Sequence, residues 1–176
     1  MTRRFLARFI PLALLVLPAL PAQAGDCRAA IRQAERAEAL PRGLLAAMAR
    51  VESGEQGRQD GWAWTVQAEG RSRHFDSRAE ALHHARALQA RGVRRIDVGC
   101  LQVNLLYHGQ AFTSLEEAFS PQANARYAAR FLRSLREQRG GWMQAVGAYH
   151  SGQPERSRAY QDKVRQAMRQ PRGGPS

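Results

Sequence analysis

The chain has 176 residues, and 27 Lys or Arg residues against 15 Asp or Glu residues give it a formal net charge of +12. This length suits one domain with one core, and the charge favours an anionic partner such as an envelope polymer, a membrane surface or a nucleic acid. The two cysteines have no further Cys or His at ligand spacing, which argues against a metal site.

The N-terminus has the pattern of a secretory signal peptide. Three Arg residues within the first eight precede an apolar run over residues 9–20, and residues 22–24 read Ala-Gln-Ala. The apolar run is short for a membrane span, and Asp26 stands before Cys27 where a lipoprotein signal has a small residue. We therefore expect residues 1–24 to be cleaved on export to the periplasm, leaving no membrane anchor. The alternative is an uncleaved N-terminal anchor.

Export changes what the charge and the cysteines imply. Residues 25–176 keep 24 basic residues against 15 acidic ones, a net charge of +9, but an exported protein does not meet genomic DNA. An even pair of cysteines in such a protein predicts a disulfide between Cys27 and Cys100. It would close a loop of roughly 74 residues and stabilise the fold by on the order of 4 kcal/mol.

Two helices are predicted first. Asp26 is a candidate cap for a helix over residues 27–39. Pro41 suits the first position of a second helix, whose apolar stripe occupies residues 44, 45, 48 and 51. Gly54 is its natural end, so Glu52 lies in the last turn, at the edge of the apolar stripe.

The next segment has strand character. Residues 63–67 and 73–75 flank Glu69-Gly70 and predict a hairpin. Ser77-Arg78-Ala79-Glu80 is a capping box for a helix that ends near Ala90. Residues 93–99 (VRRIDVG) predict a short third strand or an extended segment.

The remainder is helical. A capping box at residues 113–116 predicts a short helix, and Ser120-Pro121 opens a longer one that ends at Gly140. Residues 142–149 and 155–168 predict two more helices, and residues 171–176 form a frayed tail. The fold class is therefore mainly α, within α+β, with one domain over residues 25–170 and a small β-hairpin lobe inserted after the second helix.

Glu52 is the first candidate for chemistry. Burial disfavours the charged form of a carboxyl, and the C-terminal end of a helix acts in the same direction. A carboxyl that keeps its proton can act as a general acid on a glycosidic oxygen. The structural alternative is a Glu that turns into solvent at a frayed helix end.

Two further segments add candidate binding groups. In DVGCLQVN (residues 97–104), Gly99 allows close approach of the backbone, and Gln102 and Asn104 can hydrogen-bond a neutral sugar. In AVGAYHSG (residues 145–152), Tyr149 can stack on a sugar and bond a carboxyl through its hydroxyl. Taken alone, Gln102 is equally an ordinary turn residue and Tyr149 an ordinary core aromatic.

The order E-S-G, G-x-x-Q-x-N and A-Y-x-x-G over residues 38–165 resembles the lytic transglycosylases of the soluble (SLT) type. These belong, with goose-type lysozyme, to glycoside hydrolase family 23. The resemblance implies a lysozyme-like fold and cleavage of the MurNAc-β-1,4-GlcNAc bond of peptidoglycan. The short chain is similar to small members that serve secretion and conjugation machines.

The resemblance also assigns roles to individual residues. Glu52 takes the place of the catalytic acid, and Asn124 takes that of a recurrent asparagine. Cys100-Leu101 and His150-Ser151 depart from the family's Leu-Met and Asn-Ala. The expected substrate-binding residues are Ser53, Gly99, Gln102, Asn104, Tyr149 and His150.

The mechanism implied by the resemblance needs one carboxyl. Glu52 protonates the glycosidic oxygen and then takes the proton of the C6 hydroxyl, which closes on C1 to give 1,6-anhydro-MurNAc without water. Ordinary glycosidases use two carboxylates. Asp97 is the candidate for the second, although it is also suited to binding backbone amides of its own loop.

Other functions remain as alternatives. A lysozyme-type hydrolase would use Asp97 to activate water, and a non-catalytic wall-binding scaffold would leave Glu52 idle. A nucleic-acid binder lacks the expected cluster of basic and aromatic residues. We expect a monomer that binds peptidoglycan glycan strands, uses no cofactor or metal, and has a secretion or conjugation apparatus as a candidate partner.

Overall fold

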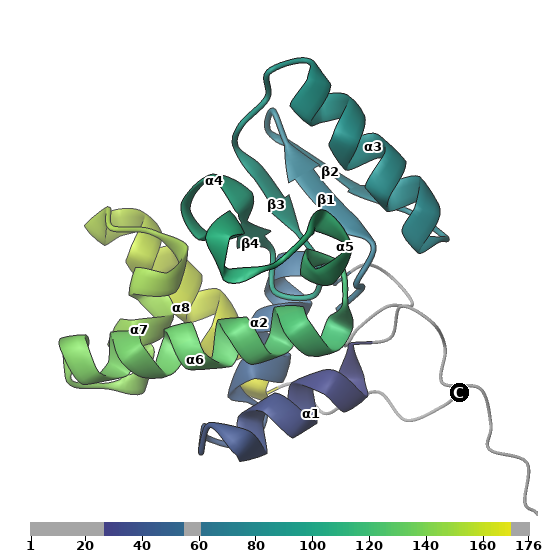
Figure 1. Cartoon of the computed structure of the whole chain (residues 1–176). Coiled ribbons are helices and arrows are strands. Elements are labelled where there is room, and N and C mark those ends of the chain that lie inside the picture. Colours follow the sequence, from purple (N-terminus) through teal and green to yellow (C-terminus); the bar gives the residue numbers. More distant parts are fainter. Residues whose placement is uncertain (1–26, 55–60, 170–176) are drawn as a thin grey trace, which may run out of the picture.

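The computed structural model describes residues 27–54 and 61–169. These residues form eight α-helices and one four-stranded antiparallel sheet, which confirms a mainly helical α+β fold of the lysozyme-like kind (Figure 1). The expected signal peptide, the Asp26 cap and the tail lie outside the described residues. Within the described residues, no helix combines the length and apolar character needed to cross a membrane.

Five helices build the larger of two cores. Leu45, Met48, Leu132 and Val164 are among its fully buried side chains. Figure 1 shows α1 and α6 side by side, with α7 and α8 at the far end of α6. The helices are α1 (Arg28–Ala37), α2 (Leu44–Ser53), α6 (Pro121–Arg139), α7 (Trp142–His150) and α8 (Pro154–Arg169).

The second helix starts later than predicted. It begins at Leu44 rather than at Pro41, because Gly43 adopts a left-handed conformation with φ of 82°. The carboxylate of Glu35 accepts hydrogen bonds from the backbone N–H groups of Gly43 and Ala46, each at 3.1 Å. This buried acid on α1 therefore supplies the N-terminal cap that α2 lacks locally. The helix ends at Gly54, as predicted.

A smaller lobe contains the sheet, in the order β2-β1-β3-β4. The predicted hairpin is confirmed, with Ala68 opposite Arg71. Its turn residues Glu69 and Gly70 have φ of 51° and 74°, as a two-residue type I′ turn requires. The elements are β1 (Thr65–Ala68), β2 (Arg71–His74), α3 (Arg78–Ala90), β3 (Ile96–Val98) and β4 (Val103–Asn104).

Three small elements were not predicted: the last strand of the sheet and the two short helices that follow it. The strand β4 and the helices α4 (Leu105–His108) and η1 (Gly109–Ala111) fall in a segment to which no element had been assigned. Asn104 begins α4 by accepting hydrogen bonds from the N–H groups of Leu106 and Tyr107. A single side chain thus ends a strand and starts a helix.

The predicted caps hold for two helices and shift for a third. Ser77 accepts from the N–H of Glu80 and Ser120 from that of Ala123, as predicted. The helix α5 (Leu115–Ala118) is capped by Ser114, not by Thr113, because the N–H of Glu117 donates to Ser114 Oγ at 3.1 Å. The capping box at this helix therefore lies one residue later than predicted.

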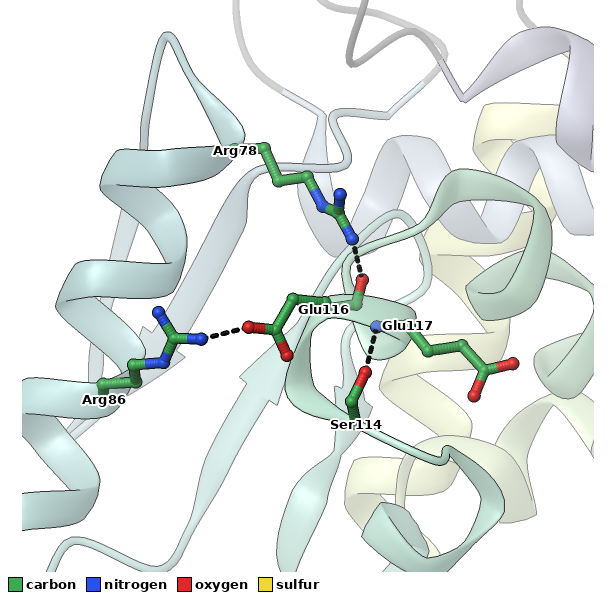
Figure 2. A network of polar contacts seen from close by, with 5 residues as sticks. All are labelled: Arg78, Arg86, Ser114, Glu116 and Glu117. Atoms are coloured by element: carbon green, nitrogen blue, oxygen red, sulfur yellow. Dashed lines mark hydrogen bonds and ion pairs between the residues drawn. The ribbon is translucent and has the colours of Figure 1, made fainter.

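Polar contacts tie the lobe to the rest of the domain (Figure 2). The Arg86 guanidinium on α3 pairs with the Glu116 carboxylate on α5, and Arg78 Nη2 donates to the Glu116 carbonyl at 2.6 Å. The predicted disulfide between Cys27 and Cys100 is present, and both cysteines are fully buried. It joins the start of α1 to the turn between β3 and β4.

Candidate active site

A cleft of about 1150 Å³ lies between the helices and the sheet. Six of the predicted site residues line it: Glu52, Asp97, Gln102, Asn104, Tyr149 and His150. Residues far apart in the chain thus meet around one hollow. Ser53 and Gly99, also predicted, stand behind its surface.

Glu52 enters the cleft from the last turn of α2, and its side chain is 14% exposed. The preceding residues from Leu44 to Ala49 are buried in the helical core, so packing fixes the direction of the carboxyl. Its Oε1 lies 3.8 Å from Nδ1 of His150. The acid is therefore largely shielded from water but open to the cleft.

Asp97 and Asn104 face one another across β3 and β4. Asn104 Nδ2 donates to Asp97 Oδ1 at 2.6 Å. Burial raises the pKa of Asp97, while the Asn104 hydrogen bond opposes that rise and the negative charge of Glu52 adds to it. We expected Asp97 to bind backbone amides of its own loop, but in the described residues its carboxylate instead accepts a hydrogen bond from a side chain on the neighbouring strand.

The turn before β4 is held by side chains that point inward. Gln102, with φ of 45°, donates from Nε2 to the Gly99 carbonyl at 2.8 Å. Gly99 has φ of 81°, and a Cβ there would overlap the side-chain amide of Asn124. Asn124 in turn binds the Leu101 N–H and the carbonyls of Val98 and Ala118. These residues shape the cleft wall, and Gln102 Oε1 remains a buried acceptor without a partner in the described residues.

Ser53 acts behind the acid rather than in the cleft. It is buried, and its Oγ donates to the Cys100 carbonyl at 2.8 Å and accepts from the Trp62 N–H at 3.0 Å. The residue after Glu52 therefore fixes the end of α2 to the disulfide-bonded turn. The hydrogen bond from Ser53 to Cys100 therefore ties the end of α2, which carries Glu52, to the turn between β3 and β4.

Tyr149 lines the cleft. We expected its hydroxyl to bond a carboxyl, but the structure gives it a different partner. Its hydroxyl donates to the Leu101 carbonyl at 3.0 Å. Burial raises the pKa of Tyr149 well above 10, and the negative charge of Glu52 raises it further. The phenol therefore stays protonated beside the acid.

A family model described as the transglycosylase SLT domain matches residues 29–170. The chain belongs to this family. Its members are lytic transglycosylases, enzymes that act as lyases on peptidoglycan, a polymer outside the cytoplasm. A search of curated proteins and a search of solved structures find no match. The family match includes every residue that lines the cleft.

Sequence reasoning missed one close neighbour of the acid in this SLT domain. Tyr160 falls in the predicted helix over residues 155–168, to which no site residue was assigned, yet its buried side chain lies beside Glu52. Burial, followed by the negative charge of Glu52, raises the pKa of Tyr160 well above 10. No group in the described residues completes a well-aligned hydrogen bond to this hydroxyl. Nothing in the spacing of the last helix could have revealed this.

Aromatic residues form a third side of the cleft. Tyr127 and Phe131 on α6 line the cleft, and their ring planes are nearly parallel, at 12°. The Tyr127 hydroxyl is 2.7 Å from His108 Nδ1, and burial lowers the pKa of His108, which favours the neutral ring. These faces are suited to packing against sugar rings. Among the described residues, no three His, Cys, Asp or Glu side chains gather to hold a metal ion.

Proposed function

We propose that this SLT domain cleaves the MurNAc-β-1,4-GlcNAc bond of peptidoglycan and forms 1,6-anhydro-MurNAc, with Glu52 as its single acid and base. The observation that carries the proposal is the position of Glu52. Its carboxyl opens into the cleft from the end of α2, where it lies beside His150 and Tyr160. Asp97, the other carboxyl in the cleft, already accepts a hydrogen bond from Asn104.

The reaction runs through two proton transfers by one carboxyl. Glu52 gives its proton to the glycosidic oxygen as the bond from that oxygen to C1 breaks, assisted at C1 by the N-acetyl group of the substrate. The C6 hydroxyl oxygen then bonds to C1, and its proton goes to the Glu52 carboxylate. The enzyme regains its starting state, and no water is consumed.

Substrate binding is proposed for the same cleft. Gln102 Oε1 is a buried acceptor that a hydroxyl or amide of the sugar would satisfy. Tyr149, Tyr127 and Phe131 offer ring faces for apolar contact with the sugars. Asn104 is proposed to contribute mainly by holding Asp97, because both ends of its amide are already bonded.

A lysozyme-type hydrolase is the second candidate, favoured by the position of Asp97 in the same cleft. In that reaction water attacks C1 and the product carries a free reducing end. The hydrogen bond from Asn104 occupies Oδ1 of Asp97 and stabilises its carboxylate, which leaves Asp97 less free to activate water. The lyase therefore fits the site better.

The cellular setting is proposed from the N-terminal pattern. Residues 1–24 act as a signal peptide, and residues 25–176 work as a monomer in the periplasm, with a secretion or conjugation apparatus as the machine they serve. The signal predicts that the exported protein starts at Gly25. N-terminal sequencing of the protein from a periplasmic extract tests this directly.

Mass spectrometry of soluble products from purified peptidoglycan tests the reaction. Residues 25–176 should release anhydro-muropeptides, and Glu52→Gln should reduce the rate by about 10²–10⁴-fold, the usual contribution of a general acid. Glu137→Gln is the matched control, because Glu137 is exposed on α6 outside the cleft. Thermal melting should show that both variants fold.

Each alternative product has a definite meaning. Reducing-end products from the wild type would establish the hydrolase and make Asp97 the next residue to replace. Full activity of Glu52→Gln would show that Glu52 is not the catalytic acid.

A further inference from the structure

The cleft extends beyond the acid, along one face of the sheet. Successive side chains of a strand point to opposite faces, and Ile96 and Val98 of β3 are buried in the second, smaller core. Arg95, just before β3, and Asp97 therefore face the cleft, and both line it. Ala68 pairs with Ile96 in the register of β1 and β3, so Arg95 lies at the end of the sheet that carries the hairpin turn.

The arginines at this end of the cleft are not neutralised by the acids around them. The hairpin turn contributes Glu69, but Arg91 Nη2 lies 3.0 Å from each of its two carboxylate oxygens and so occupies it. Arg94 and Arg95 line the cleft, are exposed, and form no ion pair within the described residues. The chain therefore presents two uncompensated positive charges to one end of its cleft.

Arg95 is oriented by an aromatic residue of the short helix α4. Its Nη2 donates a hydrogen bond to the Tyr107 hydroxyl at 2.8 Å. Tyr107 also lines the cleft, yet its side chain is largely open to solvent, with 62% of the residue exposed. This bond uses one of the several N–H groups of the guanidinium. Arg95 is thus held at the cleft while it keeps N–H groups for a ligand.

We propose that Arg95, with Arg94 beside it, binds a free carboxylate of the peptide that peptidoglycan carries on its MurNAc sugars. This inference rests on the proposed function, because it assigns another part of the same substrate to the far end of the same cleft. The sugars of a peptide-bearing strand are neutral, whereas its peptides carry carboxylates. A guanidinium binds a carboxylate through two parallel N–H bonds, and the exposed ring of Tyr107 offers an apolar face beside them.

The experiment compares native soluble peptidoglycan chains with chains whose carboxylates have been converted to amides by carbodiimide and ammonia. Dissociation constants are measured by fluorescence anisotropy of labelled chains with Glu52→Gln, which should bind without cleaving. Native chains should bind about tenfold more tightly, the lower end for hydrogen bonds to a charged group, because Arg95 is exposed. Adding Arg95→Gln should reduce this ratio to about twofold or less, since Gln can still donate to Tyr107 but carries no charge.

Further variants separate a local site from general attraction. Arg71→Gln, an exposed change on β2 outside the cleft, removes the same charge from the protein and should keep the ratio near that of the parent. Arg95→Lys keeps the charge but not the paired N–H groups, so its ratio should lie between those of Arg and Gln. Thermal melting shows that each variant folds. Arg94→Gln should also lower the ratio, and it decides the question if Arg95→Gln does not fold.

The outcomes separate this inference from the proposed reaction. Equal binding of native and amidated chains would overturn the carboxylate site, and so would an equal fall of the ratio in Arg95→Gln and Arg71→Gln, which would indicate only attraction between a basic protein and an acidic polymer. If Glu52→Gln cleaves the chains, the proposed reaction is wrong, and KM values for the two kinds of chain then test Arg95 in place of dissociation constants. Anhydro products from the wild type without a preference for native chains would remove only the role of Arg95.

Discussion

The two sides of the cleft differ in what their polar groups are bonded to. On the helical wall, formed by Glu52, His150 and Tyr160, the Tyr160 hydroxyl has no hydrogen-bond partner among the described residues, and Glu52 Oε1 lies 3.8 Å from His150 Nδ1. On the strand wall, formed by Asp97, Gln102 and Asn104 and backed by Asn124, nearly every polar atom is taken by a neighbour. Among the described residues, one buried atom on each wall lacks a hydrogen-bond partner: the Tyr160 hydroxyl on the helical wall and Gln102 Oε1 on the strand wall. The side-chain amide nitrogens of the strand wall are bonded to their neighbours, whereas the Glu52 carboxyl faces the cleft.

This difference follows from how each wall is held. The helices of the first wall are positioned by a large apolar core, so their arrangement does not depend on hydrogen bonds between side chains at the cleft. The strands of the second wall have only three and two residues and cannot fix a turn by backbone pairing alone. Side-chain hydrogen bonds complete them. We therefore propose that the helical wall supplies the catalytic acid and that the strand wall supplies the shape of the cleft.

The sharpest way to break the strand wall is Gly99→Ala. The substitution combines a left-handed backbone, with φ of 81°, and overlap of the new Cβ with the Asn124 amide. We expect a loss of about 3 kcal/mol in the free energy of unfolding, and a fall in Tm of about 6–12 °C. Thermal melting followed by circular dichroism measures it.

Gly92→Ala is the matched control, because Gly92 has φ of 82° but no atom within 4 Å of the added Cβ. It should lose only the backbone part, about 1 kcal/mol. Equal losses in the two variants would show that the contact with Asn124 does not hold the wall.

Local signals predicted much of the fold but not the distant contacts. Ser77, Ser120 and Gly140 mark helix ends through bonds or conformations within a few residues, and all three are confirmed. The predicted start of α2 was wrong because the helix is capped by Glu35, which lies 8 and 11 residues away from the two N–H groups that donate to it. A cap that comes from another helix leaves no pattern near the helix it starts.

The candidate site shows the same limit. Glu52, Gln102, Asn104 and Tyr149, which come from the three motifs, line one cleft, whereas Ser53 and Gly99 lie behind its surface. The spacing could not say that Gln102 and Asn104 use their amides within the wall, nor that Tyr160 on the last helix reaches Glu52. Those facts depend on how separate elements pack together.

Asp97→Asn tests whether the strand wall takes part in the chemistry, because the substitution removes a charge from that wall and leaves its shape nearly unchanged. The Asn side chain can still accept from Asn104 across β3 and β4. We expect activity within about tenfold of the wild type, far above the residual activity of an acid variant. A loss as large as that of Glu52→Gln, measured in the same product assay, would place chemistry on the strand wall.

The same variant carries a pH prediction for stability. Because burial raises the pKa of Asp97 above 3.8, the folded protein keeps this proton at pH values where the unfolded chain has released it. The contribution of Asp97 to stability is therefore lost as the pH rises above 3.8 and through the folded value. The Tm of Asp97→Asn should therefore rise relative to that of the wild type between pH 4 and pH 7. A relative Tm that falls over this range would contradict the raised pKa.

The smallest expected change in stability comes from the ion pair between Arg86 on α3 and Glu116 on α5, which lies on the outside of the smaller lobe (Figure 2). The two side chains are 57% and 41% exposed, so water and salt weaken their attraction. Arg78 also keeps its own bond to the Glu116 carbonyl. Arg86→Gln should therefore lower Tm by only about 1 °C, and the difference from the wild type should vanish in about 1 M salt. Arg71→Gln, an exposed change on β2, is the control. If Arg86→Gln instead lowered Tm as much as Gly99→Ala, the strand wall would be held in place from outside the cleft, and its internal hydrogen bonds would be the consequence of that attachment.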